Sequence, residues 1–113
     1  MRGLGRICFA VSVAMLALGA AVPAMADDGD IVIMIKGGKF EPSEVAAPAG
    51  KKLKIVVRNQ DATTSEFESS DFHREKVVQP RGEITVFVGP LDAGSYEFFD
   101  DFHPEDRGHL VVK

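Results

Sequence analysis

Short runs of apolar, β-branched residues dominate the chain after residue 30, and no window repeats apolar residues with the 3.6-residue period of a helix. The clearest run is 52–59, where Leu53, Ile55 and Val57 recur at every second position with lysines and an arginine on the other face, which predicts a strand buried on one face. Glycine and proline turn signals, such as Gly37-Gly38, separate the runs. The expected strands are 31–35, 45–47, 52–59, 76–78, 83–88, 95–99 and 110–112.

This series of short strands predicts an all-β fold. Strands of this length between glycine and proline turns are typical of an antiparallel Greek-key β-sandwich. Segment 92–96 adds a local prediction, a tyrosine corner in which the Tyr96 hydroxyl donates to upstream backbone. The length of 113 residues indicates one such domain.

The first 26 residues differ from the rest. Arg2 and Arg6 are followed by an uncharged apolar stretch over 7–22, and Ala24-Met25-Ala26 forms an A-x-A cleavage signal. We therefore expect a cleaved signal peptide at 1–26, a domain at 27–113 and an extracytoplasmic location. No membrane span is expected in the mature protein, because no other stretch approaches the roughly 20 apolar residues that a spanning helix needs.

Removal of the signal peptide changes the charge and the chemistry that remain. It leaves 17 acidic against 11 basic side chains, a balance that disfavours nucleic acid as a partner and favours cations. It also removes Cys8, the only cysteine, so disulfides, thiolate metal sites and cysteine nucleophiles are excluded from the domain. No Ser-His-Asp arrangement or glycine-rich phosphate loop indicates a hydrolase or a nucleotide-binding enzyme.

Candidate metal ligands concentrate in segments 63–76 and 96–109, which contain all three histidines. In the first segment, an extended backbone would send Glu66 and Glu68 to one face while Phe67 enters the core. The two carboxylates are then placed to share one cation.

The second segment offers Asp100, His103 and Asp106, spaced so that a loop between two strands can direct all three to one point. Imidazole suits Cu, Fe and Zn, whereas carboxylate oxygens suit harder cations. His73 lies near the first carboxylates, and its role as ligand or rim residue stays open. The other charged residues of these segments are interpreted as surface or structural groups: Asp101, Glu105, Arg74, Lys76 and His109.

Residues 96–112 resemble the final motif of the cupredoxins, Y-x-F-x-C-x-x-H-x-x-M-x-G-x-L-x-V, without a gap. The upstream half is also similar to a cupredoxin in the positions of Phe40, Pro42, Gly50 and Asn59. The resemblance covers nearly the whole mature chain and implies a cupredoxin-like fold.

The same resemblance implies a set of metal ligands. By position, His103 matches the histidine ligand, Asp100 stands where the copper-binding cysteine would be, and Asp106 stands where the axial methionine would be. Glu66 falls where the first histidine ligand is expected. Because a blue-copper centre needs a thiolate and two histidines, fast thiolate-mediated electron transfer is excluded. An oxygen-rich site with one imidazole would instead favour Fe(III) over Fe(II) and accept Cu(II), so the implied cofactor is copper, iron or both.

Among cupredoxin-like proteins, the stretches Glu-Phe-Glu-Ser, Arg-Glu-Lys, Tyr-Glu-Phe-Phe and Phe-His-Pro-Glu are similar to the EfeO-type domains of bacterial iron uptake. That resemblance implies a periplasmic protein that works beside a ferrous-iron binding protein and an iron permease, and that assists iron uptake by oxidising Fe(II). Two alternatives stay open at this point. One is a periplasmic copper carrier or chaperone, and the other is a metal-free sandwich whose acidic loop docks a protein.

Overall fold

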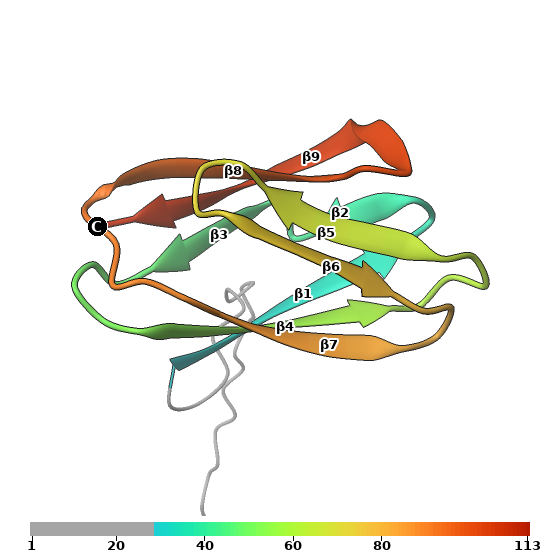
Figure 1. The fold of residues 1–113 in the computed structure, drawn as a ribbon, viewed down its shortest axis with the longest axis horizontal. Coiled ribbons are helices and arrows are strands. Elements are labelled where there is room, and N and C mark those ends of the chain that lie inside the picture. Colours follow the sequence, from blue (N-terminus) through green and yellow to red (C-terminus); the bar gives the residue numbers. More distant parts are fainter. Residues whose placement is uncertain (1–28) are drawn as a thin grey trace, which may run out of the picture.

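The computed structural model describes residues 29–113, which form two β-sheets packed face to face (Figure 1). The β-sandwich predicted from the sequence is confirmed. The expected signal peptide at 1–26 lies outside the described residues. Within 29–113, no helix has the length and apolar character needed to cross a bilayer.

The two sheets contain four and five strands. In spatial order, the first holds β2 (Lys39–Glu41), β1 (Asp30–Lys36), β4 (Leu53–Asn59) and β7 (Glu83–Val88). The second holds β3 (Glu44–Ala47), β9 (His103–Val112), β8 (Gly94–Asp100), β5 (Ser65–Ser69) and β6 (Arg74–Val78).

Both sheets are mixed, which differs from the antiparallel arrangement that the sequence predicted. β1 pairs in parallel with β4, and β3 pairs in parallel with β9. Parallel neighbours need a crossover rather than a hairpin. The chain provides one for β1 and β4, because β3, which lies between them in the sequence, belongs to the second sheet.

Three strand assignments also depart from the sequence prediction. β2 and β5 were absent from the expected strands, and β9 begins at His103 rather than at 110. The reason is visible in β5, where Phe67 is the only apolar residue and hydrophobic alternation cannot reveal a strand. The first half of β9 is equally polar, and it buries Asp106 instead of an apolar side chain.

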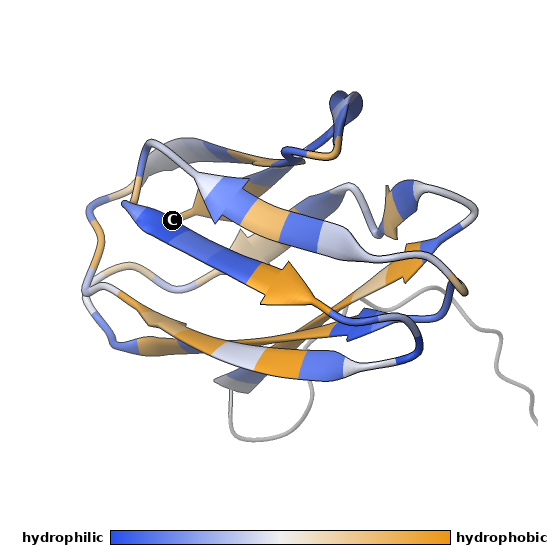
Figure 2. Cartoon of the chain, turned by 45° about the vertical axis from the view of Figure 1, so that its right-hand side comes forward, coloured by the Kyte–Doolittle hydropathy of each residue, from blue (hydrophilic) through white to orange (hydrophobic). Residues whose placement is uncertain are grey.

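The core lies between the sheets and is rich in β-branched and aromatic side chains, and Figure 2 shows the alternation of hydrophobic and hydrophilic positions along the strands. Leu53, Ile55 and Val57 are buried, as their alternation predicted. Phe67 is buried as well, and its ring packs against those of Phe40, Phe72 and Phe98 with centroids 5.1 to 6.2 Å away.

Two predicted turn features are confirmed. The Tyr96 hydroxyl donates to the Asp92 carbonyl at 2.8 Å, which forms the tyrosine corner. Gly37 and Gly38 make the β1–β2 turn with φ angles of 62° and 73°, a left-handed conformation that glycine adopts without strain. Both of their N–H groups donate to the Asp61 carboxylate at 2.8 Å, which ties this turn to the β4–β5 loop.

We expect Asp61→Ala to lower the free energy of unfolding at pH 7 by about 1 to 2 kcal/mol, because two N–H groups lose a charged acceptor. These bonds hold the pKa of Asp61 below its ordinary value of 3.8. The stabilisation is therefore present above that value and is lost as pH falls through the lower, folded-state pKa. Urea unfolding of both proteins from pH 7 to pH 2 should show the difference shrink in acid.

The control is Asp92→Ala, since the Asp92 carboxylate accepts none of the hydrogen bonds found within residues 29–113. A stability difference for Asp61→Ala that does not change with pH would contradict the role given to this carboxylate.

Candidate metal site

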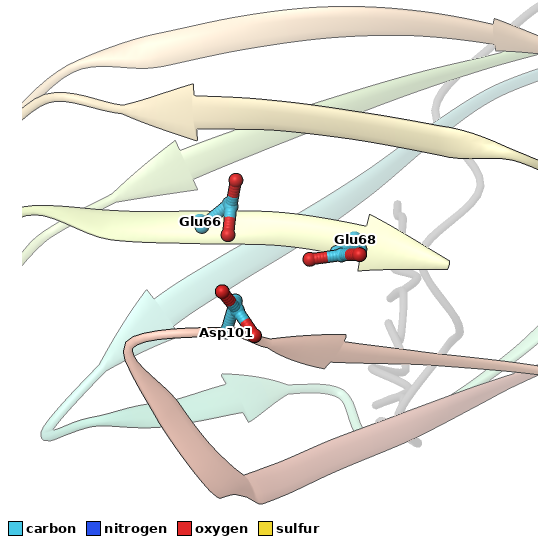
Figure 3. A group of neighbouring side chains, drawn as sticks. All are labelled: Glu66, Glu68 and Asp101. Carbon is cyan, nitrogen blue, oxygen red and sulfur yellow. The ribbon is translucent and has the colours of Figure 1, made fainter. Parts of the chain in front are cut away.

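Three carboxylates meet on the outer face of the five-stranded sheet, and we call them the outer acidic cluster: Glu66, Glu68 and Asp101 (Figure 3). One oxygen of each lies within 4.8 Å of the others. Since Phe67 points into the core, strand alternation sends Glu66 and Glu68 to the opposite face, as the sequence predicted. Asp101 reaches them from the turn between β8 and β9.

Asp101 is the residue that the sequence interpretation missed, because it was taken as a surface or structural charge. A signal was present in the alternation of β8, where the burial of Phe98 places Phe99 and then Asp101 on the outer face. The sequence interpretation did not extend this alternation to Asp101. The structure confirms the alternation by burying Phe98.

A fourth carboxylate stands beside this cluster without a compensating cation. Glu75 on β6 is directly opposite Glu68 in the register of the β5–β6 pair. In the part of the chain that the structure describes, neither these two residues nor Glu66 and Asp101 form an ion pair. Neighbouring carboxylates oppose one another's ionisation, because both carry negative charge.

Glu66 is the buried member, with 6% of its surface exposed. No backbone N–H, basic side chain or Ser, Thr or Tyr hydroxyl within residues 29–113 donates to its carboxylate. Burial, a hydrogen bond with the carboxyl group of Glu75 and the negative charges of Glu75 and Glu68 raise the pKa of Glu66 to about 7. Burial and the charges of Glu75 and Asp101 also raise the pKa of Glu68. A buried carboxylate whose hydrogen-bond partner is another carboxyl group requires a shared proton or a cation.

Asp100 lies behind this cluster and is fully buried. Its Oδ1 accepts hydrogen bonds from the N–H of Glu66 at 3.0 Å and of Phe102 at 2.9 Å, and its Oδ2 is 3.1 Å from His103 Nδ1. Glu66 and Asp100 therefore lie at the same end of the sandwich, although 34 positions separate them. Both oxygens of Asp100 are engaged by protein groups.

His103 and Asp106 complete the second predicted group. The His103 side chain is 40% exposed, and its hydrogen bond with Asp100 is the main cause that raises the pKa of the imidazole. Its Nδ1 faces Asp100, which leaves Nε2 for another partner. Asp106 is 7% exposed; its Oδ1 accepts from the Phe40 N–H at 3.1 Å, whereas its Oδ2 has no hydrogen-bond partner in the described structure. Burial is the main cause that raises the pKa of Asp106.

The other two histidines lie apart from His103. His73 is in the β5–β6 turn and lines a hollow of about 360 Å³ that Glu68 and Glu75 also line. It is not one of the three residues of the outer acidic cluster. Its role as a ligand stays a prediction. His109 is exposed, as expected, with its Nε2 3.9 Å from Glu97 Oε2.

Comparison with known proteins identifies relatives of this chain. An uncharacterized protein of Rickettsia prowazekii (strain Madrid E), RP394, is 42% identical over 84 residues, which cover 74% of this chain and 67% of that protein.

Two solved structures share the fold at identities that carry no functional argument. Amicyanin from Paracoccus versutus aligns with a TM-score of 0.62 and 20% identity, covering 78% of this chain and 85% of that chain. The metal-binding domain of the Cu(I)-exporting P-type ATPase CopA of Streptococcus pneumoniae, solved with Cu(I), aligns with a TM-score of 0.71 and 16% identity. The alignment covers 86% of this chain and 99% of that chain.

The family model for the cupredoxin-like domain matches residues 7–112. That match spans almost the whole chain and agrees with the sandwich topology. The chain belongs to the cupredoxin-like domain family.

Proposed function

We propose that this chain is a periplasmic metal-binding protein of bacterial iron uptake, of the EfeO type, that receives Fe(II) at the outer acidic cluster and favours its oxidation. The observation that carries the proposal is the buried Glu66 carboxylate, which forms no ion pair within residues 29–113 and faces Glu68 and Asp101. The resemblance in the ligand segments supports iron uptake as the setting. Its partners would be a ferrous-iron binding protein that supplies the metal and an iron permease that receives it.

The chemistry of the donors supports iron as the substrate. Three carboxylates supply hard, anionic oxygens, which bind a small, highly charged cation better than a soft one. Their negative charge stabilises Fe(III) more than Fe(II), because the attraction grows with the charge of the ion. Fe(II) at this site therefore loses one electron more readily, and dioxygen can accept that electron to give superoxide.

The copper centre known from cupredoxins fits these residues only in part. Cys is replaced by Asp100, whose oxygens are already engaged, and a blue-copper site cannot form without a thiolate. His103 Nε2 and the unpartnered Asp106 Oδ2 do suit Cu(II), which accepts imidazole nitrogen together with oxygen. When bound, copper would supply a one-electron acceptor. The protein contributes the orientation of the His103 ring through its contact with Asp100.

The unpartnered Asp106 oxygen also favours a second candidate function, a copper carrier without turnover. A carrier would bind Cu(II) through His103 and Asp106 and would leave the rate of Fe(II) loss unchanged.

The experiment that separates these functions is metal analysis of the mature protein purified without added metal, followed by titration with Fe(II) without air and with Cu(II). We then expect the protein to speed the loss of Fe(II) under air, with a further increase when Cu(II) is supplied. No effect on Fe(II) under any of these conditions, together with stoichiometric Cu(II) binding, would leave the carrier. Binding of neither metal would leave the metal-free docking sandwich.

Glu66→Gln should weaken binding of Mn(II), used as a hard probe ion, by about tenfold or more, because a ligating charge is lost. The same change should raise the free energy of unfolding of the metal-free protein at pH 8 by about 1 kcal/mol, because no buried charge then faces the other carboxylates. Opposite effects on binding and stability are typical of a ligand, and urea unfolding with Mn(II) titration measures both.

The matched control is Glu97→Gln, a glutamate on the same sheet whose Oε1 accepts from Arg107 at 2.9 Å. It should keep Mn(II) affinity and gain no stability. Equal Mn(II) affinity in Glu66→Gln and wild type would contradict the assignment of Glu66 as a ligand.

Mn(II) affinity should decrease as pH falls below about 7, since the ion must displace the proton held by Glu66. Without metal, the raised pKa means that the fold loses stability as pH rises from the ordinary value of 4.5 through about 7. Calorimetric titration in two buffers of different ionisation enthalpy should detect proton release at pH 6. An affinity that stays constant from pH 8 to pH 5 would show that Glu66 does not bind the ion.

A further inference from the structure

We propose that Asp100, which stands where cupredoxins carry the copper-binding cysteine, is not a metal ligand in this chain but a positioning residue for the outer acidic cluster. The proposal rests on the proposed function, because it needs Glu66, Glu68 and Asp101 to hold a cation. Its structural basis is the set of three contacts made by the Asp100 carboxylate, with the Glu66 N–H, with the Phe102 N–H next to Asp101, and with the His103 ring.

Protein groups occupy most of the acceptor directions of the Asp100 carboxylate. It is fully buried, two backbone N–H groups donate to Oδ1, and the His103 ring lies against Oδ2. Coordination through Oδ1 would displace at least one of its two N–H donors and leave that donor without an acceptor. That loss is itself unfavourable, because an unpaired buried polar group costs about 1 to 3 kcal/mol.

The hydrogen bond from the Glu66 N–H to Asp100 links β5 and β8 where their backbones do not pair. Between β5 and β8 the only paired positions are Glu68 and Phe99, and the pairing of β8 with β9 shifts directly after Phe99. No backbone pairing between β5 and β8 therefore extends to Glu66. The Asp100 side chain supplies the next link between the two strands, at the residue whose own carboxylate enters the cluster.

The other two contacts fix the residue that completes the cluster. The Phe102 N–H donates to Asp100 Oδ1, which closes a short side-chain turn around Asp101. Oδ2 is held against the ring of His103, three residues further on. One buried carboxylate thus connects the strand that carries Glu66 to the turn that carries Asp101. Loss of these connections would separate two ligands of one site.

The test compares Mn(II) binding to the mature protein by electron paramagnetic resonance in three variants. Asp100→Ala should weaken Mn(II) binding by about tenfold or more, as expected when a residue that orients ligands is removed. Asp100→Asn should stay within about threefold of wild type, because its amide oxygen still accepts from both backbone N–H groups. The control is Asp71→Ala, which removes the same kind of bond on the same sheet, from the Glu97 N–H to Asp71 Oδ2 at 2.8 Å.

Amide hydrogen exchange provides a second readout. The exchange of the Glu66 and Phe102 amides should accelerate in Asp100→Ala and remain slow in Asp100→Asn and in the Asp71→Ala control. If Asp100→Ala does not fold, Asp100→Asn decides, since a ligand would lose its charge and with it most of the Mn(II) affinity.

Two results would overturn the positioning role. The first is a folded Asp100→Ala protein that binds Mn(II) with wild-type affinity. The second is an Asp100→Asn protein that binds Mn(II) as weakly as Asp100→Ala. If only Asp100→Asn folds, the second result is an Mn(II) affinity more than about tenfold below that of wild type. Failure of the wild-type protein to bind Mn(II) or iron would instead overturn the proposed function. The two failures are therefore distinguishable.

Discussion

Burial of the Phe67 ring between the two sheets is the constraint on which the site depends. The ring contacts three other phenylalanines of the core, so β5 has one orientation that keeps its single apolar residue away from water. A slip of one residue would place carboxylates in the core and expose the ring. The same alternation that stabilises the core therefore sets Glu66 and Glu68 side by side on the outer face.

Without metal, repulsion between the carboxylates of the outer acidic cluster lowers the stability of the fold. Glu66 is buried beside Glu68, Asp101 and Glu75, and its raised pKa expresses the free energy needed to ionise it there. Other carboxylates in this chain are handled differently, since Asp61 has two backbone donors and Glu97 has Arg107. An arrangement that reduces the stability of the metal-free protein but offers three anionic oxygens is what a cation site requires.

Much of the fold could be predicted from the sequence, because it depends on local alternation. The half-buried β4, the tyrosine corner and the shared face of Glu66 and Glu68 all follow from residue type and period. The parallel pairs could not be predicted, since they depend on which sheet β3 joins. Strand β5 was also missed, because a strand with one apolar residue has no hydrophobic period.

The candidate site could also be predicted only in part. Asp100, His103 and Asp106 were expected to direct their donors to one point. The structure places Asp100 Oδ2 3.1 Å from His103, engages Asp100 Oδ1 with backbone groups and adds Asp101 to the glutamates. Which of these two aspartates faces outward depends on which neighbouring phenylalanine enters the core. Packing between the sheets buries Phe98, and the alternation then places Asp101 on the outer face.

The most direct test is the position of a bound ion in the folded protein. Crystals of the mature protein soaked in Mn(II) and measured at the manganese absorption edge should show an anomalous peak between the carboxylate oxygens of Glu66, Glu68 and Asp101, with Asp100 still bonded to the Glu66 N–H. A peak coordinated by Asp100, or one at His103 and Asp106 with the outer acidic cluster empty, would contradict this account.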